Sequence, residues 1–333
     1  MELLSSGFGF LVCSILIFYH GQKLSFYGNL ISIKSGLGKA WVGLILMSSV
    51  TSLPELSIGI SSVTVVGSAD LAVGNVLGSC VFNLAVLSLL DVVTPGLPVL
   101  TRVATSNVLA ASLGTILLCL VGVGLIVSNE VSILNWIGIT SLSFLIVYFI
   151  SMRLLHSYGL KQNVVNELLE EEGSNPMKLR TVLFWYAMHA AMVVVAALVL
   201  PYFSEQIAAA TGLGESFIGT LLLATSSSLP EIAVSLSAAR LGNIEMAVSN
   251  LFGSNIFNVM ILSIEDVFYT RGNLLRDASA SHVVTVFATI AMNAIAIVGL
   301  TMRPQKKGFR FFAWDTLLIL ILYMFTMLFL YLY

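Results

Sequence analysis

The hydrophobic residues of this chain gather in long, nearly uninterrupted stretches that are separated by short polar segments. A helix needs about 20 apolar residues to cross the hydrocarbon core of a bilayer. The pattern predicts an all-α membrane protein with almost no chain left for a soluble domain. Ten candidate transmembrane helices occur, at residues 5–28, 38–65, 70–92, 103–127, 131–152, 180–201, 212–238, 245–268, 280–301 and 312–332.

The composition agrees with a membrane protein. Hydrophobic residues make up 58% of the 333 positions, charged residues make up 10%, and the mean hydropathy is +0.98. A soluble domain could not bury so much apolar surface. The net charge of −2 gives no reason to expect a nucleic-acid partner. The first stretch has neither a positively charged start nor a small-residue cleavage pattern, so we expect a retained helix there and not a signal peptide.

The basic residues fall mainly on one side of the predicted membrane. If the amino terminus is outside and the stretches alternate in direction, only Arg271 and Arg276 lie outside. An excess of positive charge marks cytoplasmic loops, so we predict termini outside and a cytoplasmic middle segment, in a protein of the cell (inner) membrane. The residues on the inside are Lys23, Lys34, Lys39, Arg102, Arg153, Lys161, Lys178, Arg180, Arg240, Arg303, Lys306, Lys307 and Arg310.

The most hydrophilic part of the chain, residues 153–180, divides it into two halves. It contains four glutamates between positions 167 and 172 and a Gly-Ser-Asn-Pro sequence at 173–176. This predicts a cytoplasmic linker at 153–179 between a first five-helix repeat (1–152) and a second one (180–333). The acidic run is typical of a solvated helix or flexible connector, and a regulatory cation site is the alternative.

The two halves repeat one another at two motifs. Ser-Leu-Pro-Glu stands at 52–55 and again at 228–231, a separation of 176 residues. Gly-Ser-x-x-Phe-Asn stands at 78–83 and again at 253–258, a separation of 175 residues. The corresponding stretches are five crossings apart, so the halves must be inverted copies. Inverted repeats with interrupted helices are the usual construction of secondary transporters, whose binding site lies near the middle of the membrane.

Glu55 and Glu231 lie in the middle of apolar stretches. A charged side chain costs roughly 3 kcal/mol at that depth, and a bound cation is the simplest compensation. A structural ion pair or a buried protonated acid is the alternative. Pro54 and Pro230 each remove an amide donor, so we expect helix breaks just upstream, near residues 48–52 and 224–228. Such breaks free backbone carbonyls beside a polar cavity.

The candidate ligands around the two glutamates are all oxygen donors. Carboxylate, carbonyl and hydroxyl oxygens are hard ligands, which suit calcium or sodium. Two carboxylates balance one divalent ion and can equally hold two or three monovalent ions, which gives a physical basis for exchange. Gly74, Gly78 and Gly253 favour close approach of helices. The hydroxyl and amide candidates are Ser48, Ser49, Thr51, Ser52, Ser79, Asn83, Thr225, Ser226, Ser227, Ser228, Ser254 and Asn258.

The paired motifs resemble those of the calcium/cation antiporter superfamily, in particular its prokaryotic sodium/calcium exchanger-like members. The resemblance covers the whole chain and is carried by residues 48–55 with 74–83 and 224–231 with 249–258. It implies ten helices in two inverted halves of five, with broken helices at the ion site. It also implies four ion sites built by the second, third, seventh and eighth helices, and first and sixth helices that slide to alternate access. Cys80 stands where the family usually has Asn, and Ser249 where it usually has Gly.

The resemblance also implies a role for each candidate ligand. Glu55 and Glu231 would be the central calcium ligands, shared with sodium. Thr51 and Ser227 would offer backbone carbonyls to calcium. The central layer would be completed by Asn83 and Asn258, and the outer sodium sites would be formed by Ser52, Ser79, Ser228, Ser254 and the carbonyls of Ser48 and Ala224. No cofactor is expected beside the transported ions Ca²⁺ and Na⁺.

The leading hypothesis is a secondary antiporter, not an enzyme, that exports calcium in exchange for sodium by alternating access. A proton/calcium antiporter, or one for another divalent cation, is the alternative, because neighbouring carboxylates can share and release protons. Proton-coupled relatives usually carry a Gly-Asn-x-x-Glu block, whereas residues 74–78 end in Gly78, which favours sodium. A passive channel would conduct without a counter-ion. A hydrolase would need a residue that activates serine, and the apolar stretches offer none beside the motifs.

The four histidines give a weaker signal. His20, His156 and His282 fall near the ends of predicted stretches, whereas His189 falls inside the sixth. We interpret His189 as a packing or cavity-facing residue, with a proton relay as the alternative. The sequence leaves the oligomeric state open.

Overall fold

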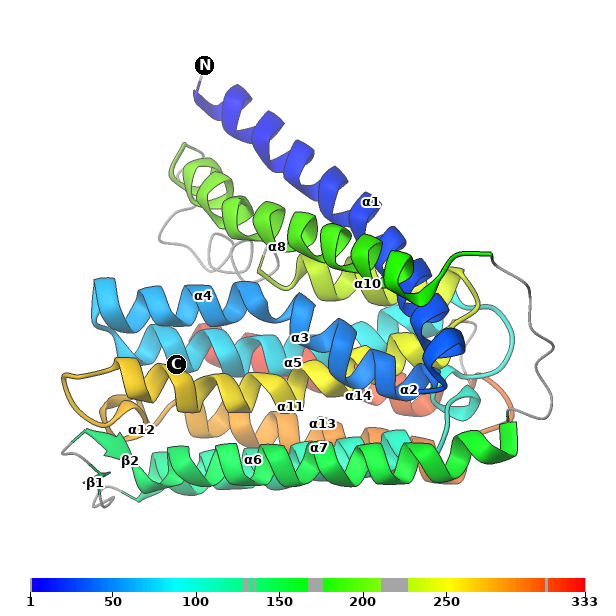
Figure 1. The fold of residues 1–333 in the computed structure, drawn as a ribbon. Helices are drawn as coiled ribbons and strands as arrows, with labels where there is room; N and C mark the ends of the chain where they lie inside the picture. The colour runs from blue at the N-terminus through cyan, green and yellow to red at the C-terminus, as the bar shows by residue number, and fades with distance from the viewer. Residues whose placement is uncertain are drawn as a thin grey trace.

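The computed structural model describes residues 2–127, 132–133, 136–166, 176–210, 227–308 and 311–332. This part of the chain is almost entirely helical (Figure 1). Eight of its helices are long and apolar enough to cross a membrane, and a shorter apolar helix spans Trp314–Leu330. The strands in these ranges are β1 (Ser132–Ile133) and β2 (Ile137–Gly138), which form one short antiparallel hairpin. The protein is therefore an integral membrane protein of helical construction.

The first half supplies five of the eight candidate spans. Its long helices are α1 (Glu2–Ser35), α5 (Ala69–Val93), α6 (Ser106–Ile126) and α7 (Ile139–Asn166). The remaining span runs from Lys39 to Val66 and is built from five short pieces. These are α2 (Lys39–Trp41), the π-helix η1 (Val42–Met47), α3 (Ser48–Thr51), α4 (Leu53–Ser61) and the π-helix η2 (Ser62–Val66), and the 3₁₀ turn η3 (Val99–Arg102) follows α5.

The second half contributes five helices of twelve or more residues to the described ranges. They are α8 (Leu179–Ala210), α10 (Leu229–Arg240), α11 (Ile244–Phe268), α13 (His282–Met302) and α14 (Trp314–Leu332), with the single turn α12 (Leu274–Asp277) between α11 and α13. Most of the predicted stretch 212–238 lies outside the described residues. The predicted linker 153–179 begins inside α7, which continues to Asn166, and its acidic run also lies outside the described residues.

The centre of the molecule is formed by α5 and α11. In the most apolar window of each span, 89% of the α11 residues and 72% of the α5 residues are buried, against 22% for α1. Helices α1 and α8 pack against each other on one side of this bundle, and α1 is inclined to the helices beneath it (Figure 1). A site carried by α5, α11 and the helices that cover them is thus shielded from solvent and from lipid.

The two expected helix breaks occur directly before the prolines. Ser52 has φ −91° and ψ 5°, and Ser228 has φ −91° and ψ 10°, so each residue leaves the helical geometry in the same way. Each is the N-cap of the helix that follows, and Pro54 and Pro230 occupy the first turn of that helix, where a missing N–H is tolerated. The sequence prediction of a break near residues 48–52 is confirmed at Ser52.

Glycine allows the broken span to lie directly against α11. A Cβ at Gly253 would overlap the backbone of Leu44, and one at Gly43 would lie 2.6 Å from the carbonyl oxygen of Met246. The prediction of close approach is confirmed for Gly253. For Gly78 an added Cβ would meet nothing within 4 Å among the described residues, so close approach of a helix at this position stays a prediction.

Two buried aspartates fix the ends of the central helices in the same manner. Asp91 lies in the last turn of α5 and Asp266 in the last turn of α11. In each aspartate, one carboxylate oxygen accepts the N–H of the residue eight positions later in the chain. The other oxygen accepts the N–H of the residue just before another helix, which is α14 for Asp91 and α7 for Asp266. The pairs are Val99 (3.0 Å) and Ala313 (2.6 Å) for Asp91, and Leu274 (2.8 Å) and Gly138 (2.7 Å) for Asp266.

Candidate ion-binding site

Glu55 and Glu231 lie in the first turns of α4 and α10, and both are fully buried. The Ser-Leu-Pro-Glu sequence produces this arrangement, because the serine ends the preceding helical segment and the proline starts the next helix. The N-terminus of a helix carries partial positive charge, which favours a carboxylate at this position. The two motifs therefore present two acidic side chains from two helix N-termini in the interior of the protein.

Serine hydroxyls bind one oxygen of each carboxylate. Ser52 donates a hydrogen bond of 3.3 Å to Oε1 of Glu231. Ser79 of α5 donates one of 3.3 Å to Oε1 of Glu55, and the hydroxyl of Ser228 in turn donates to that of Ser79 at 3.3 Å. Each glutamate is thereby linked through serine hydroxyls to the motif of the other half. The two Ser-Leu-Pro-Glu motifs thus contribute to one cluster, which contains Ser52, Glu55, Ser228 and Glu231.

The remaining hydroxyl candidates lie beside this cluster. The hydroxyl of Thr51 is 3.3 Å from that of Ser254, and it also donates to the carbonyl oxygen of Ser48 at 3.2 Å. Ser48 donates its own hydroxyl to Leu44 at 2.5 Å, and Ser227 is buried at the start of the second motif. Ala224 lies outside the described residues, as do Thr225 and Ser226.

The predicted asparagine ligands, Asn83 and Asn258, are both fully buried. Asn83 donates a hydrogen bond of 3.1 Å from Nδ2 to Oδ1 of Asn255, and its own Oδ1 has no hydrogen-bond partner among the described residues. Asn258 is fully buried, and neither its Oδ1 nor its Nδ2 is hydrogen-bonded within the described ranges. Asn75, which we did not predict as a ligand, donates a 3.2 Å hydrogen bond to the backbone carbonyl of Glu55.

Cys80 and Asn255 occupy equivalent positions of the two second motifs, and they contact each other. Nδ2 of Asn255 donates to the carbonyl oxygen of Cys80 at 3.2 Å, while Sγ of Cys80 lies 3.9 Å from the carbonyl oxygen of Asn255. These two contacts join α5 to α11 reciprocally across a separation of 175 residues. Sequence reasoning marked Cys80 only as a departure and missed Asn255, although both belong to the repeated motif.

No lysine or arginine in the described part of the chain forms an ion pair with Glu55 or Glu231. The ion pairs there lie elsewhere and join Arg276 to Asp277, His282 to Asp70 and Lys307 to Asp91. Oε2 of each central glutamate also lacks a hydrogen-bond partner in these ranges. Within the described part of the chain, these two buried acidic groups therefore have no protein counter-charge.

Residues 5–154 and 181–332 match the profile of the family described as sodium/calcium exchanger protein. The chain belongs to this family. The inner membrane protein YrbG of Escherichia coli (strain K12) is 27% identical over 255 residues, which cover 74% of this chain and 75% of YrbG. The sodium/calcium exchanger MaX1 of Methanosarcina acetivorans is 31% identical over 145 residues, or 42% of this chain and 38% of MaX1.

The fold of this exchanger-family protein is also that of a solved structure. The sodium-calcium exchanger NCX_Mj, in a crystal soaked with 10 mM Na⁺ and no Ca²⁺, superposes with a TM-score of 0.75 at 22% identity. The match covers 98% of this chain and 99% of the other. The expected resemblance is therefore confirmed for the family, the helical fold matches that of this exchanger, and the protein is a transporter of the exchanger type.

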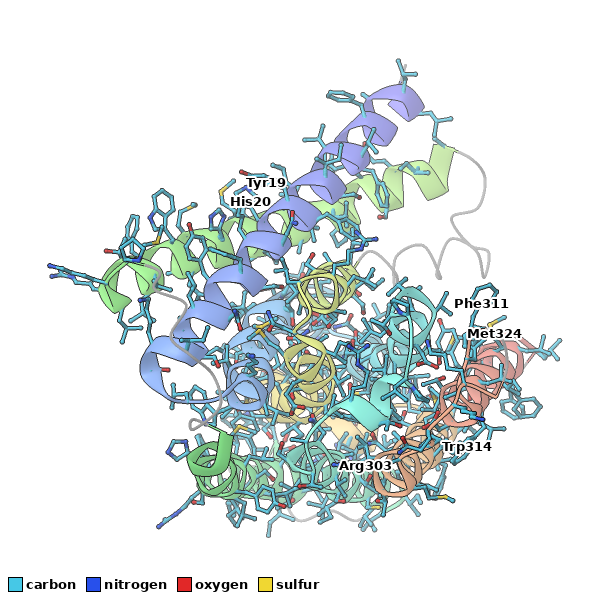
Figure 2. All side chains as sticks on the ribbon, turned by 90° about the vertical axis from the view of Figure 1, so that its right-hand side faces the viewer. Tyr19, His20, Arg303, Phe311, Trp314 and Met324 are labelled. Carbon is cyan, nitrogen blue, oxygen red and sulfur yellow. The ribbon has the colours of Figure 1, made fainter. Side chains whose placement is uncertain are left out.

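Two histidines outside the cluster join α1 to α8. Nδ1 of His20 lies 2.7 Å from Nδ1 of His189, and Tyr27 stacks on the ring of His189. Figure 2 shows His20 on α1 at its crossing with α8. The expectation that His20 lies near a helix end is wrong, because α1 extends to Ser35, well beyond the predicted end of the stretch. His189 is a buried residue at a helix contact, in line with its predicted packing role.

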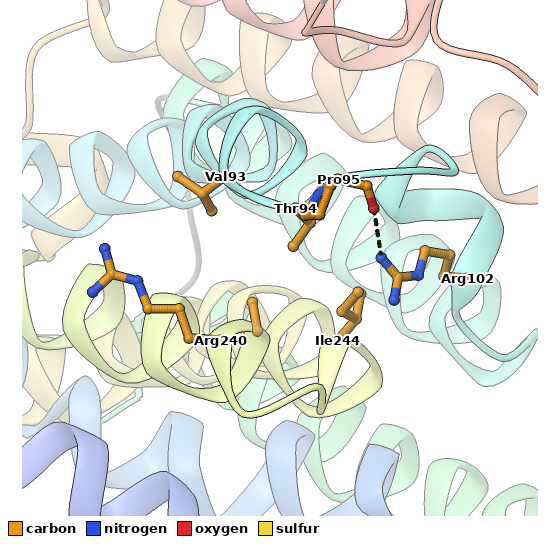
Figure 3. Close-up of a pocket in the computed structure, with 7 residues that line it drawn as sticks. Val93, Thr94, Pro95, Arg102, Arg240 and Ile244 are labelled. Atoms are coloured by element: carbon orange, nitrogen blue, oxygen red, sulfur yellow. Dashed lines mark hydrogen bonds between the residues drawn. The ribbon is translucent and has the colours of Figure 1, made fainter.

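A surface pocket lies away from the carboxylate cluster, between the end of α5, the end of α10 and the start of α11 (Figure 3). Arg102 and Arg240 flank it, and Arg102 reaches the carbonyl oxygen of Pro95 at 3.5 Å. None of the predicted ion ligands lines this pocket. The candidate ion site is thus the buried cluster and not the open pocket.

Proposed function

We propose that this protein is a secondary antiporter that exports calcium in exchange for sodium by alternating access. The observation that carries the proposal is the pair of fully buried glutamates, Glu55 and Glu231, which have hydroxyl donors on one oxygen each and no basic partner among the described residues. A buried charge without a partner is strongly unfavourable, so a cation between them would supply the missing counter-charge.

The donor set around the pair supports a hard cation as the transported substrate. Four buried acceptor oxygens lack a hydrogen bond within the described ranges: Oε2 of Glu55, Oε2 of Glu231, Oδ1 of Asn83 and Oδ1 of Asn258. Together with neighbouring hydroxyl and carbonyl oxygens, they offer the all-oxygen environment that calcium and sodium prefer. We assign the ligand roles accordingly: Glu55, Glu231, Asn83 and Asn258 at the centre with the carbonyls of Thr51 and Ser227, and Ser48, Ser52, Ser79, Ala224, Ser228 and Ser254 around them.

We further propose that residues 1–152 and 180–333 are inverted five-helix repeats joined by a cytoplasmic linker, with both termini outside the cell membrane. Three structural features that recur at equivalent positions of the two halves support the repeat. They are the breaks at Ser52 and Ser228, the Cys80–Asn255 exchange and the matching anchors of Asp91 and Asp266. An approximate twofold axis between the halves would bring equivalent residues together in this way.

Proton coupling is the second candidate. Two neighbouring carboxylates can hold protons in place of sodium, because each can share and release a proton. The pair of glutamates is compatible with either coupling ion.

Calcium flux in reconstituted liposomes distinguishes these possibilities. Purified protein is sealed into liposomes loaded with sodium, with acid, or with neither, and uptake of radioactive calcium is followed after dilution. The proposal predicts uptake driven by an outward sodium gradient. Uptake driven only by the outward proton gradient would establish the second candidate, and uptake independent of both gradients would indicate a passive channel.

A further inference from the structure

Glu265 is a third fully buried glutamate, in the last turn of α11. Within the described part of the chain neither of its carboxylate oxygens has a hydrogen-bond partner. The neighbouring Asp266 behaves differently, because both of its oxygens accept backbone N–H groups. Glu265 therefore has no structural task of the kind that explains Asp266.

The side chain of Glu265 lies against the helix that carries Glu55. A Cβ at Gly59 of α4 would overlap the Glu265 carboxylate, so the missing side chain at Gly59 makes the space for it. Gly59 follows Glu55 by four residues, which places both on one face of α4, about 6 Å apart along the axis. Ser62, three residues further on, continues this face and is buried.

The facing side of α11 carries a matching series of polar residues. Ser254, Asn258 and Glu265 are spaced by four and seven residues, which aligns them on one face of the helix. Ser254 contacts Thr51 at one end of this series, and Glu265 contacts Gly59 at the other. We call the line of contact between these two faces the α4–α11 seam. It leads from the central cluster toward the C-terminal end of α11.

Glu265 is not part of the repeated ligand set. Leu90 stands 175 positions earlier, at the equivalent place in α5, and is a buried packing residue. Of these two equivalent positions, only the one in the second half carries an acid. That acid lies on the seam that leads away from Glu55.

The charged groups around this end of α11 are engaged with other partners. Arg271 donates to the carbonyl oxygen of Gly67 at 3.4 Å, and Arg276 pairs with Asp277 at 2.9 Å. Asp70 at the start of α5 accepts the N–H of Ser279 and lies 3.3 Å from Nε2 of His282. On α4 the acidic neighbour is Glu55, and on α11 it is Asp266. Among the described residues no basic group neutralises Glu265, and the simplest neutral form of a buried carboxyl group is the protonated one.

We propose that Glu265 is a proton-binding site on the ion pathway, protonated while the α4–α11 seam is closed and ionised when the seam hydrates and admits a cation. Opening releases H⁺ from the carboxyl group to the aqueous side, and the carboxylate then attracts the cation toward Glu55. Closing the seam returns a proton from the same side. This inference rests on the proposed antiport function and adds a second, outer binding step to it.

Kinetics of calcium uptake in sodium-loaded liposomes, measured at several external pH values, test this proposal. Wild type should show an apparent KM for calcium that rises as the pH falls. Glu265→Gln keeps the shape of the protonated acid but cannot ionise, so at high pH its KM should be about tenfold higher than that of wild type. The two values should converge at low pH, and Glu265→Asp should restore the pH dependence.

Two further variants separate this effect from general ones. Gly59→Ala would push the carboxylate out of the seam and should resemble Glu265→Gln. Asp70→Asn removes an exposed acid near the same end of the molecule and should leave the pH profile unchanged. Identical KM values for wild type and Glu265→Gln at every pH, or the same change in Asp70→Asn, would overturn the proposal. Absence of gradient-driven uptake in wild type would instead contradict the proposed antiport function.

Discussion

Ser52 donates a hydrogen bond of 3.3 Å to Glu231, a residue 179 positions later in the chain. Ser52 also caps the helix that presents Glu55. The break in one span therefore supports the carboxylate of the other half, and the proposed ion site depends on both halves at once. This dependence suits a transporter in which relative movement of two parts changes access to a site between them.

The first prediction concerns this hydrogen bond. Ser52→Ala removes the donor to Oε1 of Glu231 and one hydroxyl from the cluster, at a cost of about 1 kcal/mol. We expect a roughly fivefold higher apparent KM for calcium in liposome flux, with the protein still folded. Ser57→Ala is the matched control, because Ser57 lies exposed on the same helix and donates only to the carbonyl of Leu53 among the bonds described. An unchanged KM in Ser52→Ala would remove Ser52 from the site.

The second prediction concerns the contact between α11 and the broken span. Gly253→Ala places a methyl group on the backbone of Leu44, which cannot move without displacing η1. Overpacking of this kind costs about 1–3 kcal/mol, so the melting temperature in detergent should fall. Gly78→Ala adds the same methyl group to α5 at a position with no neighbour within 4 Å in the described ranges, and should leave the melting temperature nearly unchanged. Equal stability of the two variants would contradict the close contact.

The third prediction concerns the aspartate anchors. Asp266→Asn replaces one of two acceptor oxygens with an amide donor that faces a backbone N–H, which should destabilise the protein by about 1–3 kcal/mol. Asp91→Asn should have a similar or larger effect, because Lys307 also lies 3.4 Å from this carboxylate. Thermal unfolding in detergent measures both. Asp277→Asn, which alters an ion pair at the surface, serves as the control and should change stability little.

Most residues of the central candidate site belong to the two repeated sequence motifs, so they could be predicted from the sequence. The helix breaks and the buried glutamates follow from the chemistry of Pro54 and Pro230 and from acids in apolar stretches. The hydrogen bonds of Asp91 and Asp266 depend on loops and on helices that are distant in sequence, so no local pattern indicates them. Glu265 was a detectable acid in an apolar stretch, but its burial against Gly59 appears only when α4 and α11 are packed together.

The position of two other residues needed the tertiary structure. Whether Gly78 faces a helix or open space depends on the rotation of α5, which composition does not determine. The pairing of His20 with His189 depends on the crossing point of α1 and α8. For Gly78 and for the histidines, the sequence identified the residue but could not indicate which neighbour it faces.

The central claim is that Glu55 and Glu231 together bind the transported cation. The most direct measurement is sodium-driven calcium uptake by liposomes that contain Glu55→Gln or Glu231→Gln, each checked for folding by its elution and melting temperature in detergent. Our account predicts that either folded variant loses calcium uptake, because a single carboxylate cannot balance a divalent ion in the interior. Near-normal uptake by either variant would contradict it.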